Sequence, residues 1–334
     1  MWKTAEYAIM GRGHERTQVP CQDKTYSVSR NGTAVVALAD GAGSASLSHL
    51  GAETATQAIA HELVDHFDEL ILNPDGQAVK ERLLKVSVDA LNETASENQC
   101  SLQDLACTLL AAAIKDNIFL LIHLGDGIVA MEKNQELKLA SAPDNGEYAN
   151  STYFLTSKNA LRHLKLFKGS TQDLNGFALM SDGTAESFYH RKSGQLSIGV
   201  KKMMDLSVLI SDEKFDSFLD ASFKQVIRAN TQDDCSIALI TNQALAPKTY
   251  QSLDRLAKYD LFEINPNNPA IAAKRLKKFE RILAEIERCP NRLHAVSKQL
   301  HIRRKYLKRD LDVLVGNGLV VNQKGLYQMH LQQL

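Results

Sequence analysis

The stretch Ala37–His49, ALADGAGSASLSH, joins the end of an apolar segment to the expected start of a helix. The segment that leads into it, Thr33–Asp40 (TAVVALAD), is apolar and β-branched and follows the turn pair Asn31-Gly32, so we expect a buried strand. This strand ends in Asp40, with glycine directly after it. An aspartate in that position is either a turn cap or a metal ligand. The choice depends on where the other acidic residues of the chain lie.

Five more aspartates lie at the boundaries of expected strands. They are Asp23 before KTYSVSR, Asp126 after LLIHLG, Asp182 after ALMS, and the pair Asp233 and Asp234 before CSIALI. If the strands pair in two packed sheets, these ends converge on one rim. Clustered carboxylates repel one another, and their pKa values are raised unless a cation neutralises them. Hard divalent ions such as Mg²⁺ and Mn²⁺ take oxygen ligands, so the pattern favours a site for these ions.

The remaining pattern indicates an α+β fold with mostly antiparallel sheets. Further strands are expected at CTLLAAAI (107–114), NIFLLIHLGD (117–126), GIVAMEK (127–133), GFALMSDG (176–183) and DDCSIALIT (233–241). Helical apolar spacing covers residues 48–67, 78–95 and 214–228. Strands that follow one another directly, with helices grouped between them, favour this arrangement over strict β-α-β alternation.

The composition indicates a soluble globular protein. The chain of 334 residues is 44% hydrophobic and 23% charged, and its length suggests two domains. No apolar run approaches the ~18–20 residues that span a bilayer, and the first residues lack the layout of a secretory signal, so we expect no membrane association. The five cysteines include no CxxC pair, which argues against a zinc site or a disulfide framework and favours the cytoplasm.

The charge is unevenly distributed along the chain. Residues 270–334 contain 14 Lys/Arg and 5 Asp/Glu, a net charge of +9, so the remainder carries −9 because the whole chain is neutral. A turn-rich segment, FEINPNNPA (262–270), precedes the basic part. We therefore expect a first domain over residues 1–245, a linker over 246–270 and a basic second domain over 271–334.

The ordered set CQD, ALADGAGS, ACTLLAAAI, HLGDG, ALMSDGTAE and DDCSIALI resembles the metal-dependent PPM/PP2C serine/threonine phosphatases, in particular their compact bacterial branch. The resemblance covers residues 1–242. It implies a PP2C-like antiparallel β-sandwich flanked by helices, with two Mn²⁺ or Mg²⁺ ions at one edge and possibly a third.

The resemblance implies a role for each strand-end residue. Asp40 would bridge both metals, and the Gly41 carbonyl would bind one of them. Asp182 and Asp233 would ligate the other metal. The two ions would lower the pKa of a shared water and so supply hydroxide for in-line attack on phosphorus, without a covalent phosphoenzyme.

Three further aspartates have supporting roles in this comparison. Asp23 would hold a metal-bound water. Asp126 matches the acid that binds a third, weaker metal in many bacterial members. Asp234 stands where the family often has asparagine, so we expect it to lie behind the ligands.

The chain departs from the family pattern at the general acid. Many members have histidine after the Asp-Gly pair, where this chain has Ala42. His14, in GRGHERTQ, is a candidate proton donor, and a surface histidine is the alternative. Arg16 is our candidate for the phosphate-binding arginine, and a solvated loop charge is the alternative.

The basic segment resembles the winged helix-turn-helix of bacterial regulators over residues 271–331. Helices are expected at 271–288, 293–300 and 303–315, followed by a hairpin that turns at 323–325. The cations of the recognition helix and the wing would be Arg303, Arg304, Lys305, Lys308, Arg309 and Lys324. Such a module binds either an acidic protein surface or DNA, and we favour a protein partner.

These observations lead to one principal functional hypothesis. The chain is predicted to be a metal-dependent protein serine/threonine phosphatase that acts on a phosphoprotein and opposes a protein kinase. The alternative is a phosphatase-like sensor or transcriptional regulator that binds DNA or a protein partner through the winged helix. A two-metal nuclease would use similar carboxylates but explains the order of the motifs poorly.

Overall fold

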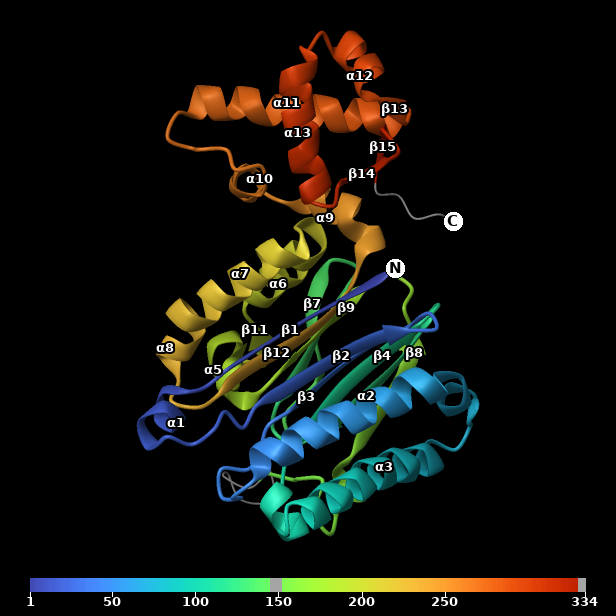
Figure 1. The fold of residues 1–334 in the computed structure, drawn as a ribbon, viewed down its shortest axis with the longest axis vertical. Helices are drawn as coiled ribbons and strands as arrows, with labels where there is room; N and C mark the ends of the chain where they lie inside the picture. Colours follow the sequence, from blue (N-terminus) through green and yellow to red (C-terminus); the bar gives the residue numbers. More distant parts are fainter. Residues whose placement is uncertain (145–151, 330–334) are drawn as a thin grey trace. The chain divides into compact units, whose positions relative to one another are not determined.

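The computed structural model describes residues 1–144 and 152–329, and the chain divides into two compact units (Figure 1). The first, here called the N-terminal unit, consists of Trp2–Met204 and Asp216–Thr241. The second, the C-terminal unit, consists of Met1, Asp205–Phe215 and the residues from Asn242 onward. Among the helices of the described residues, none has the length and apolar composition that a bilayer crossing needs.

The N-terminal unit is built on two five-stranded sheets. One sheet is antiparallel throughout and has the order β2 (Lys24–Arg30), β3 (Thr33–Ala39), β4 (Leu109–Lys115), β5 (Ile118–Leu124) and β8 (Lys165–Ser170). The other has the order β1 (Trp2–Ile9), β12 (Cys235–Asn242), β9 (Leu174–Met180), β6 (Ile128–Lys133) and β7 (Glu136–Ser141), and it is antiparallel from β12 to β7. A two-stranded hairpin, β10 (Tyr189–His190) and β11 (Gln195–Leu196), follows β9 in the chain.

Strand β3 explains why the two sheets stack. Every residue of β3 is buried. Its even-numbered side chains, such as Val36 and Leu38, join a core with Phe177, Leu179 and Ile240 of the second sheet. Its odd-numbered side chains join a different core against the flanking helices. Because successive side chains of a strand point to opposite faces, a continuous apolar run is what a strand covered on both faces requires.

Helices cover the outer faces of the sandwich. The α2 helix (Ser48–Leu72) packs on the β2–β8 sheet through small and branched residues such as Ala52, Ala55 and Ile59. The α3 helix (Gly76–Glu97) joins the same core through Val79, Leu83 and Leu91. The other helical elements of this part of the chain are α1 (Arg12–Thr17), η1 (Leu102–Leu105), α4 (Ala160–His163), α5 (Asp182–Phe188), α6 (Ile198–Leu209), α7 (Asp212–Ser222), the π-helical turn η2 (Phe223–Ile227) and α8 (Arg228–Asn230). The boundary between the two units falls within α6 and again within α7.

The C-terminal unit is helical with one small sheet. Its elements are η3 (Gln243–Leu245), α9 (Ala246–Ser252), α10 (Arg255–Leu261), α11 (Pro269–Arg288), β13 (Asn291–Arg292), α12 (Leu293–Leu300), α13 (Arg304–Gly316), β14 (Val320–Gln323) and β15 (Leu326–Met329). The strands form an antiparallel sheet in the order β13–β15–β14. Apolar residues of α11, α12 and α13 form one core with Leu319 and Tyr327. The amphipathic pattern of residues 271–288 is therefore explained by burial of one face.

The segment expected to be a linker is structured. Residues 246–261 form α9 and α10, and Tyr259, Leu261 and Phe262 are buried in the core of the C-terminal unit. Residues 205–215 also belong to this unit rather than to the first one. The turn-forming asparagines and prolines occupy only the short connection between α10 and α11. The domain boundaries at residues 245 and 270 stay predictions.

Candidate metal and active site

The strand register brings the predicted acids to one end of the sandwich. Lys24 of β2 pairs with Ala39 of β3 in the antiparallel register. Asp23 precedes Lys24 and Asp40 follows Ala39, so the two aspartates lie side by side at the same end of the sheet. In the second sheet Ile128 pairs with Met180, and both Asp126 and Asp182 lie two residues beyond that pair. The sequence placed these acids at strand ends, and the antiparallel pairing explains why the ends coincide.

The backbone of Asp40 is held by hydrogen bonds to Thr108, the residue that precedes β4. The Asp40 N–H donates to Thr108 Oγ1 at 2.9 Å, and the Thr108 N–H donates to the Asp40 carbonyl at 2.8 Å. Gly41 continues this pairing as an isolated bridge to Cys107. The loop after β3 is therefore fixed for two residues past the strand. Thr108 lies within the motif ACTLLAAAI, but sequence reasoning gave it no role at the site.

Asp182 and Asp233 come from the second sheet. Asp182 is the first residue of α5 and lies two residues after the end of β9 at Met180. Asp233 precedes β12 and is exposed, and its Oδ1 accepts a hydrogen bond at 2.9 Å from the N–H of Asp234. Asp126 follows Gly125 at the end of β5, and its Oδ2 accepts a hydrogen bond from Thr152 Oγ1 at 2.5 Å.

The pKa values show that the acids repel one another. Burial, followed by the charges of Asp23, Asp182, Asp233 and Asp126, raises the pKa of Asp40 well above its usual range. Burial, followed by the charges of Asp233 and Asp126, raises the pKa of Asp182 to about 6. A cluster in which each carboxylate destabilises the others is the environment that a bound cation stabilises.

Asp23 is the most deeply buried of these acids. It is 1% exposed, and neither carboxylate oxygen has a hydrogen-bond donor of ordinary geometry among the described residues. Burial raises its pKa well above the usual value, although the nearby hydroxyl groups of Ser181 and Ser236 oppose this rise. A buried carboxylate with these two hydroxyl groups as its nearest donors can also serve as an acceptor for a further group at the site.

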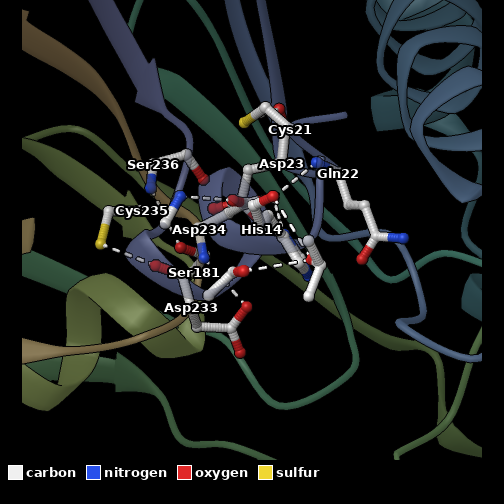
Figure 2. A network of polar contacts seen from close by, with 12 residues as sticks. His14, Cys21, Gln22, Asp23, Ser181, Asp233, Asp234, Cys235 and Ser236 are labelled. Carbon is white, nitrogen blue, oxygen red and sulfur yellow. Dashed lines mark hydrogen bonds and ion pairs between the residues drawn. The ribbon is translucent and has the colours of Figure 1, made fainter. Parts of the chain in front are cut away.

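Asp234 fastens the N-terminal segment to β12 (Figure 2). Its Oδ1 accepts a hydrogen bond from the Gly11 N–H at 2.6 Å, and its Oδ2 accepts one from the Gln22 N–H at 2.5 Å. His14 Nδ1 lies 3.0 Å from the same Oδ2. The carboxylate is 2% exposed. Asp234 thus positions both His14 and the residue before Asp23, and its expected place behind the metal ligands stays a prediction.

Replacing Asp234 by alanine is expected to lower kcat by about 10- to 100-fold, because the segment that carries Asp23 and His14 loses its anchor. The same change leaves two buried N–H groups without acceptors, which costs about 1–3 kcal/mol of stability each. Asp75→Ala is the matched control, since Asp75 also accepts two backbone N–H groups, at the start of α3. Steady-state kinetics and thermal unfolding check both changes; an equal loss of kcat in the two variants would contradict the anchoring role.

The two candidate residues of the N-terminal segment, His14 and Arg16, lie on a short helix, α1. The Arg16 guanidinium is exposed and donates to the Gln232 side-chain oxygen at 2.6 Å. No ion pair joins Arg16 to an acid within the described residues. The proposed roles of His14 and Arg16 in catalysis therefore stay predictions, and only His14 contacts the acidic network.

A close backbone approach sets the position of Asp182. A Cβ atom added to Gly183 would lie 2.2 Å from the Asp234 carbonyl oxygen, so no side chain fits there. Gly183→Ala is expected to move α5 away from β12, to lower kcat by about 10- to 100-fold and to cost about 1–3 kcal/mol. Gly76→Ala is the control, since a Cβ atom there meets nothing within 4 Å. Near wild-type kcat in Gly183→Ala would show that this spacing is unimportant.

The donor set suits a hard divalent cation. It consists of carboxylate oxygens, and three of these, both of Asp23 and Oδ1 of Asp182, are buried without a hydrogen-bond donor among the described residues. Over residues 1–144 and 152–329, no three His, Cys, Asp or Glu side chains are arranged as a finished ligand set. The acids are gathered at one end of the sandwich, where their oxygens could hold such a cation.

Comparison with known proteins identifies the family of the chain. The family model described as Protein phosphatase 2C matches residues 10–239. Serine/threonine-protein phosphatase 3 of Escherichia coli (strain K12) is 28% identical over 189 residues, which cover 54% of this chain and 73% of that protein. A solved bacterial serine phosphatase has 12% identity and a TM-score of 0.52, and covers 72% of this chain and 98% of its own. The solved serine/threonine phosphatase of S. agalactiae has 13% identity and a TM-score of 0.50, and covers 72% and 99%.

The likeness to the solved structures concerns the fold, and it confirms the predicted phosphatase-type sandwich of the first part of the chain. It does not extend to the predicted winged helix, which stays a prediction. The family model spans well over half of the 334 residues. The chain therefore belongs to the protein phosphatase 2C family, and the prediction of a protein serine/threonine phosphatase is confirmed.

Proposed function

We propose that this chain hydrolyses phosphoserine and phosphothreonine in a phosphoprotein with the help of two divalent cations, Mn²⁺ or Mg²⁺. One observation supports the proposal above all others: the strand register gathers Asp23, Asp40, Asp126 and Asp182 at one end of the sandwich. Carboxylates brought together in this way raise one another's pKa values and retain unpaired buried oxygens.

The cations would be held by residues of both sheets. In this proposal Asp40 and the Gly41 carbonyl serve one ion, Asp40, Asp182 and Asp233 serve the other, and Asp126 serves a third, weaker one. Such ions, when bound, would supply a hydroxide nucleophile at neutral pH and would neutralise charge on the phosphoryl oxygens.

The chain's own residues position the reacting groups and handle protons. Asp23, buried beside Asp40, accepts a hydrogen bond from a water molecule at the site and orients it. The Asp234 carboxylate favours a proton on Nδ1 of His14, which leaves Nε2 as the ring nitrogen that exchanges a proton with the leaving oxygen. Arg16 would have to leave Gln232 in order to bind the substrate phosphate.

The test is hydrolysis of p-nitrophenyl phosphate and of a phosphothreonine peptide with Mn²⁺, with Mg²⁺ and after chelation. Turnover that requires the metal and returns when Mn²⁺ is added back supports the proposal. Equal turnover with and without chelator would reject metal dependence. Tight peptide binding without any turnover would instead support the alternative, a phosphatase-like sensor.

Two finer predictions belong with this function. We propose that a protein kinase supplies the phosphoprotein, because phosphoserine and phosphothreonine in proteins are products of phosphoryl transfer. We also propose that residues 271–329 form a winged-helix module. The order α11–β13–α12–α13–β14–β15, with a three-stranded antiparallel sheet, supports this second proposal.

A further inference from the structure

A surface pocket of about 370 Å³ lies in the N-terminal unit, on the helix that begins with Asp182. We call it the α5 pocket, and it is lined by residues 186–190 and 195–197. Its walls are therefore the second half of α5 and the β10–β11 hairpin. Ligand pockets of proteins have volumes of about 300–1,000 Å³, so this pocket has room for one long side chain of a peptide. None of its lining residues has a role in the hydrolysis proposed above.

Hydrogen bonds and close packing hold both walls in place. The Ser197 N–H donates to the Phe188 carbonyl at 2.8 Å, which ties the end of the hairpin to the end of α5. The Gly194 N–H donates to the His190 carbonyl at 2.9 Å and closes the hairpin turn. A Cβ atom added to Gly199 would lie 2.9 Å from the Phe188 ring, so this ring packs against the start of α6. The α5 pocket is therefore formed before any ligand binds.

Glu186 gives the α5 pocket its charge. The Glu186 side chain is exposed, and no ion pair joins it to another residue in the described part of the chain. His190 Nδ1 accepts a hydrogen bond from the Ser193 N–H at 3.3 Å, which favours a neutral ring with its proton on Nε2. Arg191 and Lys192 lie in the hairpin turn and do not line the pocket. The full charge among the lining residues is therefore the negative charge of Glu186.

Aromatic rings accompany this carboxylate. Phe188 and Tyr189 line the pocket, and both are partly buried. A carboxylate together with aromatic rings suits a guanidinium or ammonium group, because the carboxylate attracts the charge and the rings contact the cation and its apolar stem. An acidic side chain would be repelled by Glu186. The composition of the α5 pocket therefore favours a basic side chain.

The α5 pocket lies close to the acids of the candidate active site. Glu186 follows Asp182 by four residues, which is about one turn and about 6 Å along the helix axis. The charge of Glu186 also acts on Asp233: burial is the largest cause that raises the pKa of Asp233, and Glu186 contributes to the rise. An extended peptide spans about 3.3–3.6 Å per residue. A side chain two or three residues from the phosphorylated one therefore reaches the pocket.

We propose that the α5 pocket binds an arginine or lysine side chain of the phosphoprotein, two or three residues from the phosphorylated serine or threonine. The proposal rests on the proposed function and adds to it a preference for substrates with a basic residue near the phosphorylated one. Glu186 is a specificity residue in this account, since it contacts the substrate peptide and not the reacting atoms.

The experiment measures kcat and KM with Mn²⁺ for phosphothreonine peptides of one common background sequence. Arginine, alanine or glutamate occupies in turn each position two or three residues before or after the phosphothreonine. We expect wild type to prefer arginine to alanine by about 5- to 10-fold in kcat/KM at one or more of these positions, mainly through KM.

Three variants show whether Glu186 causes the preference. Glu186→Gln is expected to lose it, and Glu186→Lys is expected to prefer the glutamate peptide. Glu97→Gln, which changes an exposed glutamate at the end of α3, is the matched control and is expected to keep the wild-type preference. All three are expected to hydrolyse p-nitrophenyl phosphate within about 2-fold of wild type, because this substrate has no side chain for the pocket. Equal thermal unfolding shows that the variants are folded.

Four results would overturn the proposal. They are equal kcat/KM for the arginine and alanine peptides at every position, an arginine preference that survives in Glu186→Gln, an equal loss in Glu97→Gln, or a wild-type preference for glutamate. The last result would assign peptide recognition to Arg191 and Lys192.

Failure of the proposed function gives a different result, in which wild type hydrolyses none of the peptides. The α5 pocket is then tested by fluorescence anisotropy of the same peptides, labelled, with Mn²⁺. Binding of an arginine peptide at least about 5-fold more tightly than the alanine peptide, lost in Glu186→Gln, would support the pocket. Equal binding of the two peptides, or no binding, would overturn it.

Discussion

Asp40→Asn is expected to reduce kcat for p-nitrophenyl phosphate by about 10³-fold or more at saturating Mn²⁺. Asp40 is the acid on which the charges of Asp23, Asp126, Asp182 and Asp233 all act, so it is the centre of the cluster. An asparagine keeps the shape of the side chain and the backbone bonds to Thr108, but it removes the negative charge that two cations would share. A loss of about 4 kcal/mol in transition-state stabilisation corresponds to about 10³-fold in rate.

The matched control is Asp116→Asn, an exposed aspartate in the β4–β5 turn. Its backbone has φ of 50°, a conformation that asparagine tolerates. The control is expected to retain wild-type kcat and the same dependence on Mn²⁺. If Asp40→Asn kept more than about a tenth of wild-type kcat with an unchanged requirement for Mn²⁺, Asp40 would not be a shared ligand.

Asp182→Asn is expected to change stability in opposite directions with and without metal. In the folded protein the pKa of Asp182 is raised from 3.8 to about 6, so the folded state binds the proton more tightly than the unfolded state does. Stability contributed by this group is therefore present below pH ~4, falls as the pH rises to about 6, and stays low above that. Removing the charge restores at most about 3 kcal/mol at pH 7, or about 5 °C in Tm, in the presence of chelator.

With Mn²⁺ present the order is expected to reverse. Wild type gains stability by binding the metal in the folded state only, and the variant loses part of that gain together with most of its activity. The measurement is thermal unfolding of both proteins at pH 7, with chelator and with Mn²⁺. A variant less stable than wild type under both conditions would show that Asp182 is a structural carboxylate.

The fold could be predicted where the pattern is local. The buried strands β3, β4, β5, β9 and β12 have continuous apolar runs, and their ends were placed within a few residues. Strands β7 and β8 were missed because they lie at the edges of their sheets, where charged residues interrupt the apolar ones: Glu136 and Lys138 in β7, Lys165 and Lys168 in β8. Charged edges protect a sheet from further pairing, and they also weaken the pattern that identifies a strand.

The candidate metal ligands could be predicted from the sequence, but the residues that hold them in position could not. Aspartates at strand ends can be read directly from the sequence, whereas Asp234 acts on Gly11, His14 and Gln22, more than 200 positions away. The close contact of Gly183 with the Asp234 carbonyl likewise depends on the packing of α5 against β12. The hydrogen bond from Arg16 to Gln232 likewise joins residues that are far apart in the sequence, so it could not be predicted from a local pattern.

The central claim is tested most directly by diffraction from crystals soaked in Mn²⁺, with data collected at the manganese absorption edge. The account predicts two anomalous peaks about 3.5–4 Å apart, with the Asp40 carboxylate between them and Asp182 and Asp233 on one of the two. A site without peaks at saturating Mn²⁺, or peaks that Asp40 does not contact, would contradict it.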